Sequence, residues 1–328
     1  MSDAKNGEVL VEVQHLCKYF TVGANFFGKT TSVLKAVDDV SFQIRKGEAF
    51  GLVGESGCGK STIGKMLVDL YTPTSGKILF DGQDLTAMKK KERRRFCRDI
   101  QLIFQDPYAS LNPRMTVGDI IAEPIRINHL RPKEEIEKRV EYLLGCVGLS
   151  ASYRNRYPHE FSGGQRQRVG IARALAVEPK LIVCDEPVSA LDVSIQAQVL
   201  NLLDELKEEF GLTYLFIAHG LNVVKHISDR VGVMYLGKLM EIAPKNELYH
   251  NPLNPYTQAL LSAIPSVDPN NRQKRIILQG DVPSPIDPPP GCRFCSRCFK
   301  RTDGCDQHTP QLREVSPDHH VACHLFEG

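Results

Sequence analysis

Apolar residues along the chain form short, nearly continuous runs that alternate with longer amphipathic stretches. Residues 49–53, 181–185 and 214–218 are almost entirely apolar, which is typical of strands buried on both faces of a sheet. Residues 193–210 carry an apolar stripe at helical spacing and predict an amphipathic helix. Strands that alternate with helices predict an α/β fold with a mainly parallel sheet and helices on both faces.

A second pattern, alternation of apolar and polar residues, marks another part of the chain. It occurs in residues 40–44 and 77–80 and, less regularly, in residues 9–16, as expected for strands with one exposed face. These strands predict a small antiparallel β subdomain beside the parallel sheet. Residues 117 to about 178 favour helices and follow a proline-containing loop, so we place a helical subdomain at about 106–178.

The amino-acid composition of the sequence changes after Pro244. Prolines are dense between residues 252 and 290, which favours an extended connector. Five of the ten cysteines follow, in residues 292–323. We therefore divide the chain into a main domain, residues 1–245, and a proline-rich, cysteine-rich C-terminal extension, residues 246–328.

Composition excludes several classes of protein. A net charge of +2 over 328 residues gives no reason to expect a nucleic-acid partner. No apolar run approaches the roughly 18 residues of a membrane span, and residues 1–8 lack the apolar core of a secretory signal. We expect a cytosolic protein that could lie against a membrane protein. The basic run at residues 89–95 is expected to be the solvated face of a helix.

The most informative stretch, residues 54–61, reads Gly-Glu-Ser-Gly-Cys-Gly-Lys-Ser and fits the phosphate-binding motif G-x-x-x-x-G-K-[ST]. Its glycines let the backbone turn successive N–H groups toward an anion. Lys60 can reach the β- and γ-phosphates, the Ser61 hydroxyl can bind Mg²⁺, and the following helix adds the positive end of its dipole. The predicted nucleotide contacts of this loop are Gly54, Glu55, Ser56, Gly57, Cys58, Gly59, Lys60, Ser61 and Thr62.

Further motifs follow the phosphate loop in a fixed order. They are Gln105 at a strand end, Ser162-Gly163-Gly164-Gln165 at a helix start, the acid pair Asp185-Glu186 at a strand end, Asp192, and His219 at the end of the next apolar strand. In order and spacing they resemble the ATP-binding subunit of an ABC transporter, over about residues 9 to 245, and the Ser-Gly-Gly-Gln motif is specific to that family. The resemblance implies an ABC-type P-loop ATPase that binds ATP and Mg²⁺ between two subunits.

The resemblance also implies a catalytic role for each matched residue. Asp185 holds Mg²⁺, with Ser61 and Gln105 as further Mg²⁺ contacts. Glu186 polarises the attacking water as general base, and His219 senses the γ-phosphate. Gln105 also contacts the water and lies near the membrane subunits. Positioning and charge neutralisation of this kind are what phosphoryl transfer needs.

Other matched residues are expected to hold the nucleotide. Phe20 should stack on the adenine; the neighbouring Tyr19 is the rival, because adjacent strand residues face opposite ways. Residues 162–165 should bind the γ-phosphate of ATP held by the opposite subunit, through N–H groups at a helix N-terminus. Asp192 should contact the partner across the same interface.

One departure from the family pattern concerns the switch histidine. The family usually has Ser-His-Asp there, whereas residues 218–220 read Ala-His-Gly. The histidine is present and the following acid is not. We expect catalysis to persist because Glu186 and His219 are both present.

The extension resembles that of oligopeptide and dipeptide importer ATPases, at residues 251–265, 280–285 and 288–292. The second, F-type ATPase subunit of these permeases matches best. The resemblance implies a heterodimer with a second ATPase subunit at the cytoplasmic face of the membrane, two transmembrane permease subunits, and an extracellular peptide-binding protein. Some relatives move nickel complexes or other small solutes, so an importer of such a solute is the alternative.

The clustered cysteines favour a metal site, because thiols stay reduced in the cytosol. The spacing Cys-x-x-Cys-x-x-Cys is typical of iron–sulfur ligation, and zinc is the alternative. Histidines available for zinc are His308, His319, His320 and His324. The family's extensions hold cysteines that match Cys292, Cys298, Cys305 and Cys323, and some members carry a [4Fe–4S] cluster there. Cys295 is extra, and either replaces Cys298 as a ligand or is a bystander.

Two other functions compete with the transporter. A soluble, non-transport ABC ATPase usually has long coiled-coil insertions or two fused nucleotide domains, and this sequence has neither. A small GTPase-like switch would need a base-reading Asn-Lys-x-Asp, which does not occur here.

Overall fold

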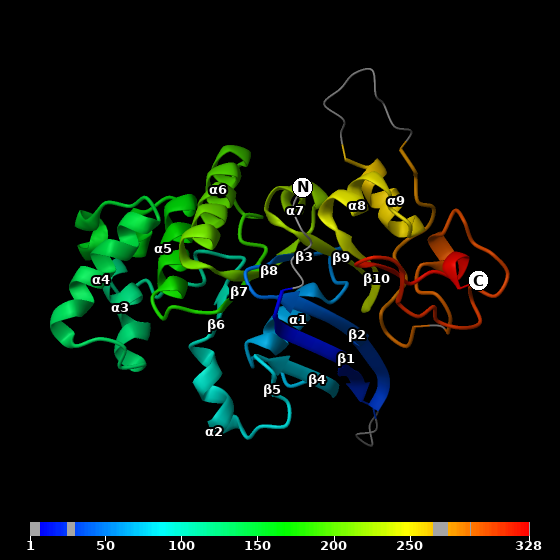
Figure 1. Cartoon of the computed structure of the whole chain (residues 1–328), viewed down its shortest axis with the longest axis horizontal. Coiled ribbons are helices and arrows are strands. Elements are labelled where there is room, and N and C mark those ends of the chain that lie inside the picture. The colour runs from blue at the N-terminus through cyan, green and yellow to red at the C-terminus, as the bar shows by residue number, and fades with distance from the viewer. Residues whose placement is uncertain (1–6, 25–29, 265–274, 289, 328) are drawn as a thin grey trace.

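The computed structural model describes residues 7–24, 30–264, 275–288 and 290–327, and consists of two sheets, flanking helices and a C-terminal extension (Figure 1). The large sheet has the strand order β11-β12-β10-β9-β3-β8-β7-β6, and its run from β9 to β6 is parallel. The mainly parallel sheet predicted from the sequence is therefore confirmed. Its strands are β3 (Ala49–Val53), β6 (Ile100–Ile103), β7 (Leu181–Asp185), β8 (Thr213–Ala218), β9 (Arg230–Tyr235), β10 (Lys238–Pro244), β11 (Arg313–Ser316) and β12 (His319–Val321).

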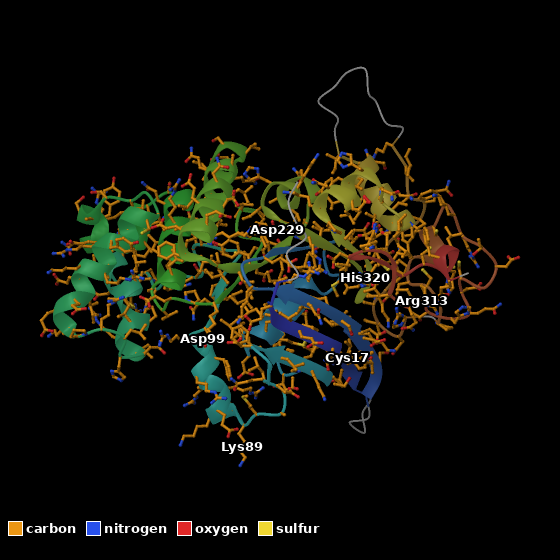
Figure 2. The ribbon with its side chains drawn as sticks, in the orientation of Figure 1. Cys17, Lys89, Asp99, Asp229, Arg313 and His320 are labelled. Carbon is orange, nitrogen blue, oxygen red and sulfur yellow. The ribbon has the colours of Figure 1, made fainter. Side chains whose placement is uncertain are left out.

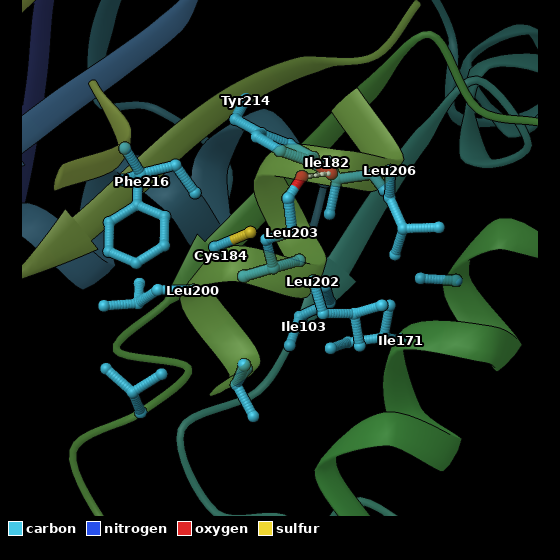
Figure 3. Packing of buried hydrophobic residues seen from close by; sticks show 14 of the residues in the cluster. Ile103, Ile171, Ile182, Cys184, Leu200, Leu202, Leu203, Leu206, Tyr214 and Phe216 are labelled. Atoms are coloured by element: carbon cyan, nitrogen blue, oxygen red, sulfur yellow. Dashed lines mark hydrogen bonds between the residues drawn. The ribbon is translucent and has the colours of Figure 1, made fainter. Parts of the chain in front are cut away.

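The central strands are apolar throughout because both faces of the sheet are covered. Ile182 and Cys184 of β7 pack against α6 (Val193–Phe210), with Leu203 among the residues beneath them (Figure 3). Leu181 and Val183, which alternate with them, belong to the core on the opposite face. That second core includes residues of α1 (Lys60–Leu67), while α7 (Leu221–Ile227) packs with the first.

The second sheet, antiparallel with the order β2-β1-β4-β5, lies over the α1 side of the main sheet. Its strands are β1 (Val9–Ala24), β2 (Thr30–Arg45), β4 (Ser75–Phe80) and β5 (Gln83–Asp84). The alternating segments thus form the predicted antiparallel layer. The basic run forms α2 (Lys90–Arg93) and η1 (Arg94–Cys97), no residue of α2 is buried, and Lys89 projects from the body (Figure 2).

The helical subdomain occupies one end of the molecule. It consists of α3 (Val117–Ile127), α4 (Lys133–Cys146), η2 (Ala151–Asn155), η3 (Pro158–Glu160) and α5 (Gly163–Leu175). Within the part of the chain that the structure describes, no helix is both long enough and apolar enough to span a bilayer.

The extension is more ordered than its proline content suggests. It contains α8 (Lys245–His250), α9 (Pro255–Ser262), η4 (Cys295–Arg297) and η5 (His324–Phe326). The prediction of an extended connector is wrong for α9, because Pro255 takes the first helical turn, where proline is tolerated, and the Asn254 side chain caps the helix. Residues 275–288 contain no helix and pair with β2 only through an isolated bridge between Leu34 and Ile286.

The extension also continues the main sheet, which the sequence did not indicate. Strand β12 pairs antiparallel with β10, matching Val321 to Glu241 and His320 to Ile242. In Figure 2, His320 and Arg313 lie in the red-brown segment beside the end of the main sheet. The cysteine-rich segment is therefore anchored to the nucleotide-binding core through backbone hydrogen bonds.

Candidate functional site

The phosphate loop connects β3 to α1 and depends on glycine at two positions. Gly54 has φ of 153° and Gly59 has φ of 107°. A Cβ atom at Gly54 would lie 2.0 Å from the Met234 carbonyl oxygen, and one at Gly59 would lie 2.1 Å from the Ala36 carbonyl oxygen. Any side chain here would displace backbone, so the tight loop is available only to glycine.

The Lys60 ammonium group folds into the loop. Its Nζ donates to the carbonyl oxygens of Gly54 at 2.7 Å and Glu55 at 3.1 Å, and the residue is 3% exposed. The amine therefore lies within the turn of backbone that the sequence motif assigns to phosphates.

The other predicted catalytic residues converge at the carboxyl ends of β6, β7 and β8. Ser61 Oγ donates to Asp185 Oδ1 at 2.7 Å. Glu186 accepts from Gln105 Nε2 at 2.6 Å through Oε2, and its Oε1 lies 2.7 Å from His219 Nε2. The carboxyl ends of parallel strands are where α/β sheets bind ligands. The structure thus brings these five residues together from four separate elements.

Glu186 has an unusual backbone. Its φ is 51°, in the left-handed region that non-glycine residues seldom adopt, and the residue is 5% exposed. Its N–H donates to the Ile217 carbonyl oxygen at 3.0 Å. Such strain is concentrated at functional sites and persists only where the surroundings hold it. Here it turns the carboxylate toward Gln105 and His219.

The Ser-Gly-Gly-Gln motif opens α5, as predicted. Ser162 is the N-cap: its Oγ accepts from the Gln165 N–H at 3.3 Å, and Gln165 Oε1 accepts from the Ser162 N–H at 3.0 Å, a reciprocal capping box. Ser162 is exposed, and a Cβ at the buried Gly164 would lie 2.5 Å from Ile195 Cγ2 of α6. The motif therefore presents its N-terminus to solvent.

Asp192 is also exposed, as the N-cap of α6. Its Oδ1 accepts from the Ile195 N–H at 2.9 Å and from Ser194 Oγ at 2.8 Å. These hydrogen bonds hold the pKa of the Asp192 carboxyl below its usual range. Capping of α6 explains why an acid occupies this position. The exposed side of Asp192 remains accessible to a partner.

The two candidate adenine contacts differ in their surroundings. Tyr19 donates its hydroxyl to Asp38 Oδ1 at 2.5 Å, and burial with this bond raises the Tyr19 pKa well above its usual value. Phe20 is half-buried, with its ring edge-on to Tyr71 at 5.7 Å and Lys18 Nζ 5.0 Å from its centroid. Both rings are half-buried and lie beside a lysine, but only the Tyr19 ring is held by a hydroxyl hydrogen bond.

The departure at Gly220 leaves the switch histidine in place. Gly220 has φ of −101° and ψ of 131°, an extended conformation open to any residue. The nearest atom to an added Cβ is Asn222 Oδ1, the end of a flexible side chain. Glycine here is therefore not a backbone requirement, and His219 contacts Glu186 without a following acid.

The five cysteines of the extension line one small cavity, whose other walls include Phe294. The Cys292 N–H donates to the Cys305 carbonyl oxygen at 2.7 Å. Burial raises the pKa of Cys292 to about 12, and the thiols of Cys323, Cys298 and Cys305 contribute. Each thiolate would raise the pKa of the neighbouring thiols. A metal cation in the cavity would favour the thiolate forms instead.

Of the histidines predicted as alternative zinc ligands, two lie together and His319 bonds elsewhere. His319 Nε2 lies 2.7 Å from Glu241 Oε1 and is fully buried. His308 and His324 lie beside Glu327, with one ligand atom of each within 4.8 Å of the others. No three cysteine thiols of the described chain meet that distance. A tetrahedral zinc site with Zn–S bonds of about 2.3 Å would need closer sulfurs.

Three residues that contact the site were not found from the sequence. Arg297 and Tyr256 of the extension both bond to Glu55 of the phosphate loop, and Arg293 bonds to Asp38 beside Tyr19. Their separations along the chain are large, 201 residues for Tyr256 and 242 for Arg297, so no local pattern marks them.

Comparison with known proteins gives consistent matches. Residues 37–189 match the ABC transporter family, and residues 240–305 match the oligopeptide/dipeptide transporter C-terminal region. The oligopeptide transport ATP-binding protein AppF of Bacillus subtilis is 55% identical, covering 98% of this chain and 99% of that protein. The oligopeptide transport ATP-binding protein OppF of Salmonella typhimurium is 54% identical, covering 96% of each.

Solved structures match over nearly three-quarters of the chain. A dimeric, post-hydrolysis ATP-binding cassette, MJ0796, bound to ADP and Pi has a TM-score of 0.64 and 29% identity, covering 72% of this chain and 99% of that one. The cbiO1 protein of Clostridium perfringens, part of the transporter complex cbiONQ, has a TM-score of 0.65 and 28% identity, covering 74% of this chain and 92% of that one.

Proposed function

This chain belongs to the oligopeptide transport ATP-binding proteins of the ABC transporter family, and we propose that it is the ATP-hydrolysing subunit of a dipeptide or oligopeptide importer. The observation that carries the proposal is the joint placement of Ser61, Gln105, Asp185, Glu186 and His219 beside the phosphate loop. The C-terminal match to peptide transporters favours peptide over nickel or another solute.

Hydrolysis follows from the positions of these side chains. The loop amides and Lys60 bind the β- and γ-phosphates, and Ser61 with Asp185 would hold Mg²⁺, which neutralises phosphate charge. A Glu186 carboxylate oxygen takes a proton from the attacking water. Gln105, hydrogen-bonded to Glu186, and His219, whose Nε2 lies 2.7 Å from Glu186 Oε1, keep the carboxylate oriented and would lie beside the γ-phosphate.

The second half of the site comes from another subunit. The exposed N-terminus of α5 supplies N–H donors suited to an anion, and Ser162 to Gln165 would bind the γ-phosphate of ATP held by the partner. The dimeric arrangement of the similar cassette MJ0796 supports this. ATP then joins the two subunits, and its hydrolysis releases them. Asp192, exposed at the start of α6, would also contact the partner subunit.

The remaining partners follow from the family. We infer a different ATPase subunit as the dimer partner, two transmembrane permeases, and an extracellular binding protein that delivers peptide. The chain would lie at the cytoplasmic face of the membrane. Phe20 would stack on adenine, since the Tyr19 hydroxyl is committed to Asp38.

Uptake is the direct test of this function. The chain, tagged and purified in detergent from its host, should bring down two permeases and a second ATPase. In proteoliposomes with these partners and the binding protein, short peptides should stimulate ATP hydrolysis and accumulate inside. Nickel with the same binding protein is the control solute. Stimulation by nickel and not by peptides would contradict the proposed substrate.

The cysteines would hold a [4Fe–4S] cluster. Cys292, Cys298, Cys305 and Cys323 form the ligand set we favour, because they match the cysteines of the family's extensions and line one cavity. Iron–sulfur ligation also suits thiols spaced more widely than a zinc ion allows. The cluster would supply a covalent cross-link to a segment with little core of its own.

Metal analysis distinguishes the ligand sets. Anaerobically purified protein should be brown and contain about four iron and four sulfide per chain, as a [4Fe–4S] cluster requires. Cys298→Ser should lose the iron, whereas Cys295→Ser, the matched control, should keep it. Colourless protein with one zinc per chain would contradict the cluster, and the reverse pattern of the two variants would make Cys295 the ligand.

A further inference from the structure

The cysteine-rich segment makes direct contact with the phosphate loop through Arg297. Its Nη1 donates to both carboxylate oxygens of Glu55, at 3.1 and 3.0 Å, and to the Tyr235 hydroxyl at 3.3 Å. The side chain of Arg297 is 10% exposed and that of Glu55 is 26% exposed. Because this ion pair is largely shielded from solvent, its electrostatic attraction is screened less than that of a surface pair.

The same loop residue is held a second time through its backbone. The Glu55 N–H donates to the hydroxyl of Tyr256, a fully buried residue of α9. Phe294 packs against both tyrosines of this junction, with ring centroids 5.4 Å from Tyr235 and 5.2 Å from Tyr256. An aromatic cluster therefore connects the start of the cysteine motif to the loop.

The charge of Glu55 gives this contact a consequence for nucleotide binding. A carboxylate next to Gly54, at the start of the loop, would repel a triphosphate if it were unpaired. The Arg297 guanidinium neutralises that charge. It also holds the Glu55 side chain against the cysteine-rich segment, while the Tyr256 hydroxyl holds the Glu55 backbone. The contacts of Arg297 with Glu55 and Tyr235 all come from one guanidinium nitrogen, Nη1.

We propose that Arg297 is a positioning residue for ATP, because through Glu55 it fixes the phosphate loop. The affinity for nucleotide then depends on how well the cysteine-rich segment is ordered. This inference rests on the proposed ATPase function. It assigns the extension a role inside the nucleotide site in addition to any contact with partners. The coupling is reciprocal, so bound ATP must also stabilise the segment around Arg297.

Nucleotide binding by the full chain tests the proposal. Arg297→Gln should weaken binding of a fluorescent ATP analogue about tenfold or more, since charge-assisted pairs are the strong hydrogen bonds. Arg301→Gln, the control, removes an exposed surface pair with Asp306 in the same extension and should leave binding unchanged. Arg297→Lys should restore part of the affinity by restoring the charge. In steady-state hydrolysis, KM should rise with little change in kcat.

Glu55→Gln tests the same contact without touching the extension. It removes the charge that Arg297 balances, so adding Arg297→Gln to it should weaken binding far less than in the wild type. Peptide mass spectrometry gives a second readout: ATP should slow amide hydrogen exchange in the peptide around residue 297 in the wild type and not in Arg297→Gln. Equal binding by the Arg297→Gln and Arg301→Gln variants, or simple additivity with Glu55→Gln, would overturn the inference. Failure of the wild type to bind ATP would instead remove the proposed function.

Discussion

Replacing Glu186 with glutamine should stop ATP hydrolysis and leave ATP binding intact. The glutamine amide has nearly the same size and can still hydrogen-bond to Gln105 and His219, so the buried pocket should keep its shape. It cannot take a proton from water. Loss of a general base lowers rates by about 10²–10⁴-fold, and kcat should fall by at least that much. The trapped ATP should hold two subunits together.

Phosphate release and size-exclusion chromatography with ATP measure the two halves of this expectation. Glu209→Gln, on the exposed surface of α6, is the matched control and should hydrolyse ATP at the wild-type rate. Normal turnover by Glu186→Gln would show that another group accepts the proton. Loss of both turnover and ATP binding would mean that the left-handed backbone at Glu186 needs the carboxylate itself.

The sequence could indicate that these residues lie together because they follow apolar strands in chain order. Asp185 and Glu186 follow an apolar run, and His219 follows the next, so parallel pairing of the two strands places them together. The amphipathic stripe likewise predicted the bounds of α6, residues 193–210, because a long helix carries its own periodic signal.

The parts that could not be predicted depend on contacts between distant segments. Strand β12 is only three residues long and contains two histidines, so neither length nor hydrophobicity marks it as an extension of the main sheet. It is a strand because β10 offers it an edge. The sequence does not mark helix α9 because dense prolines favour an extended connector. Pro255 instead occupies the first turn, where the missing N–H costs nothing.

The junction that secures this unforeseen strand is a buried contact between a glutamate and a histidine, and breaking it should destabilise the protein more than any surface change. Glu241 of β10 and His319 of β12 are both fully buried, with Oε1 and Nε2 2.7 Å apart. Glu241 also accepts from the N–H groups of Leu253 at 2.8 Å and Asn254 at 3.1 Å. One carboxylate thus joins the main sheet, the added strand and the start of α9.

Glu241→Ala should therefore cost about 3–5 kcal/mol of unfolding free energy, as removal of one member of a buried pair does. His319→Ala should cost less, because Glu241 would keep its two backbone donors. Circular dichroism in a urea titration measures both, since the chain has no tryptophan to report by fluorescence. Glu247→Ala, at an exposed site in α8, is the control and should change stability by under about 1 kcal/mol.

The order of the two variants distinguishes this account from a simple loss of packing. If the pair acted only as filler, the larger histidine would leave the larger cavity and His319→Ala would be the worse variant. If the carboxylate instead acts as the shared acceptor, Glu241→Ala leaves a histidine and two buried N–H groups without their partner. That variant should then lose more unfolding free energy than His319→Ala. Amide exchange should then accelerate at Leu253 and Asn254 in Glu241→Ala and remain slow in His319→Ala, because only the first variant removes their acceptor.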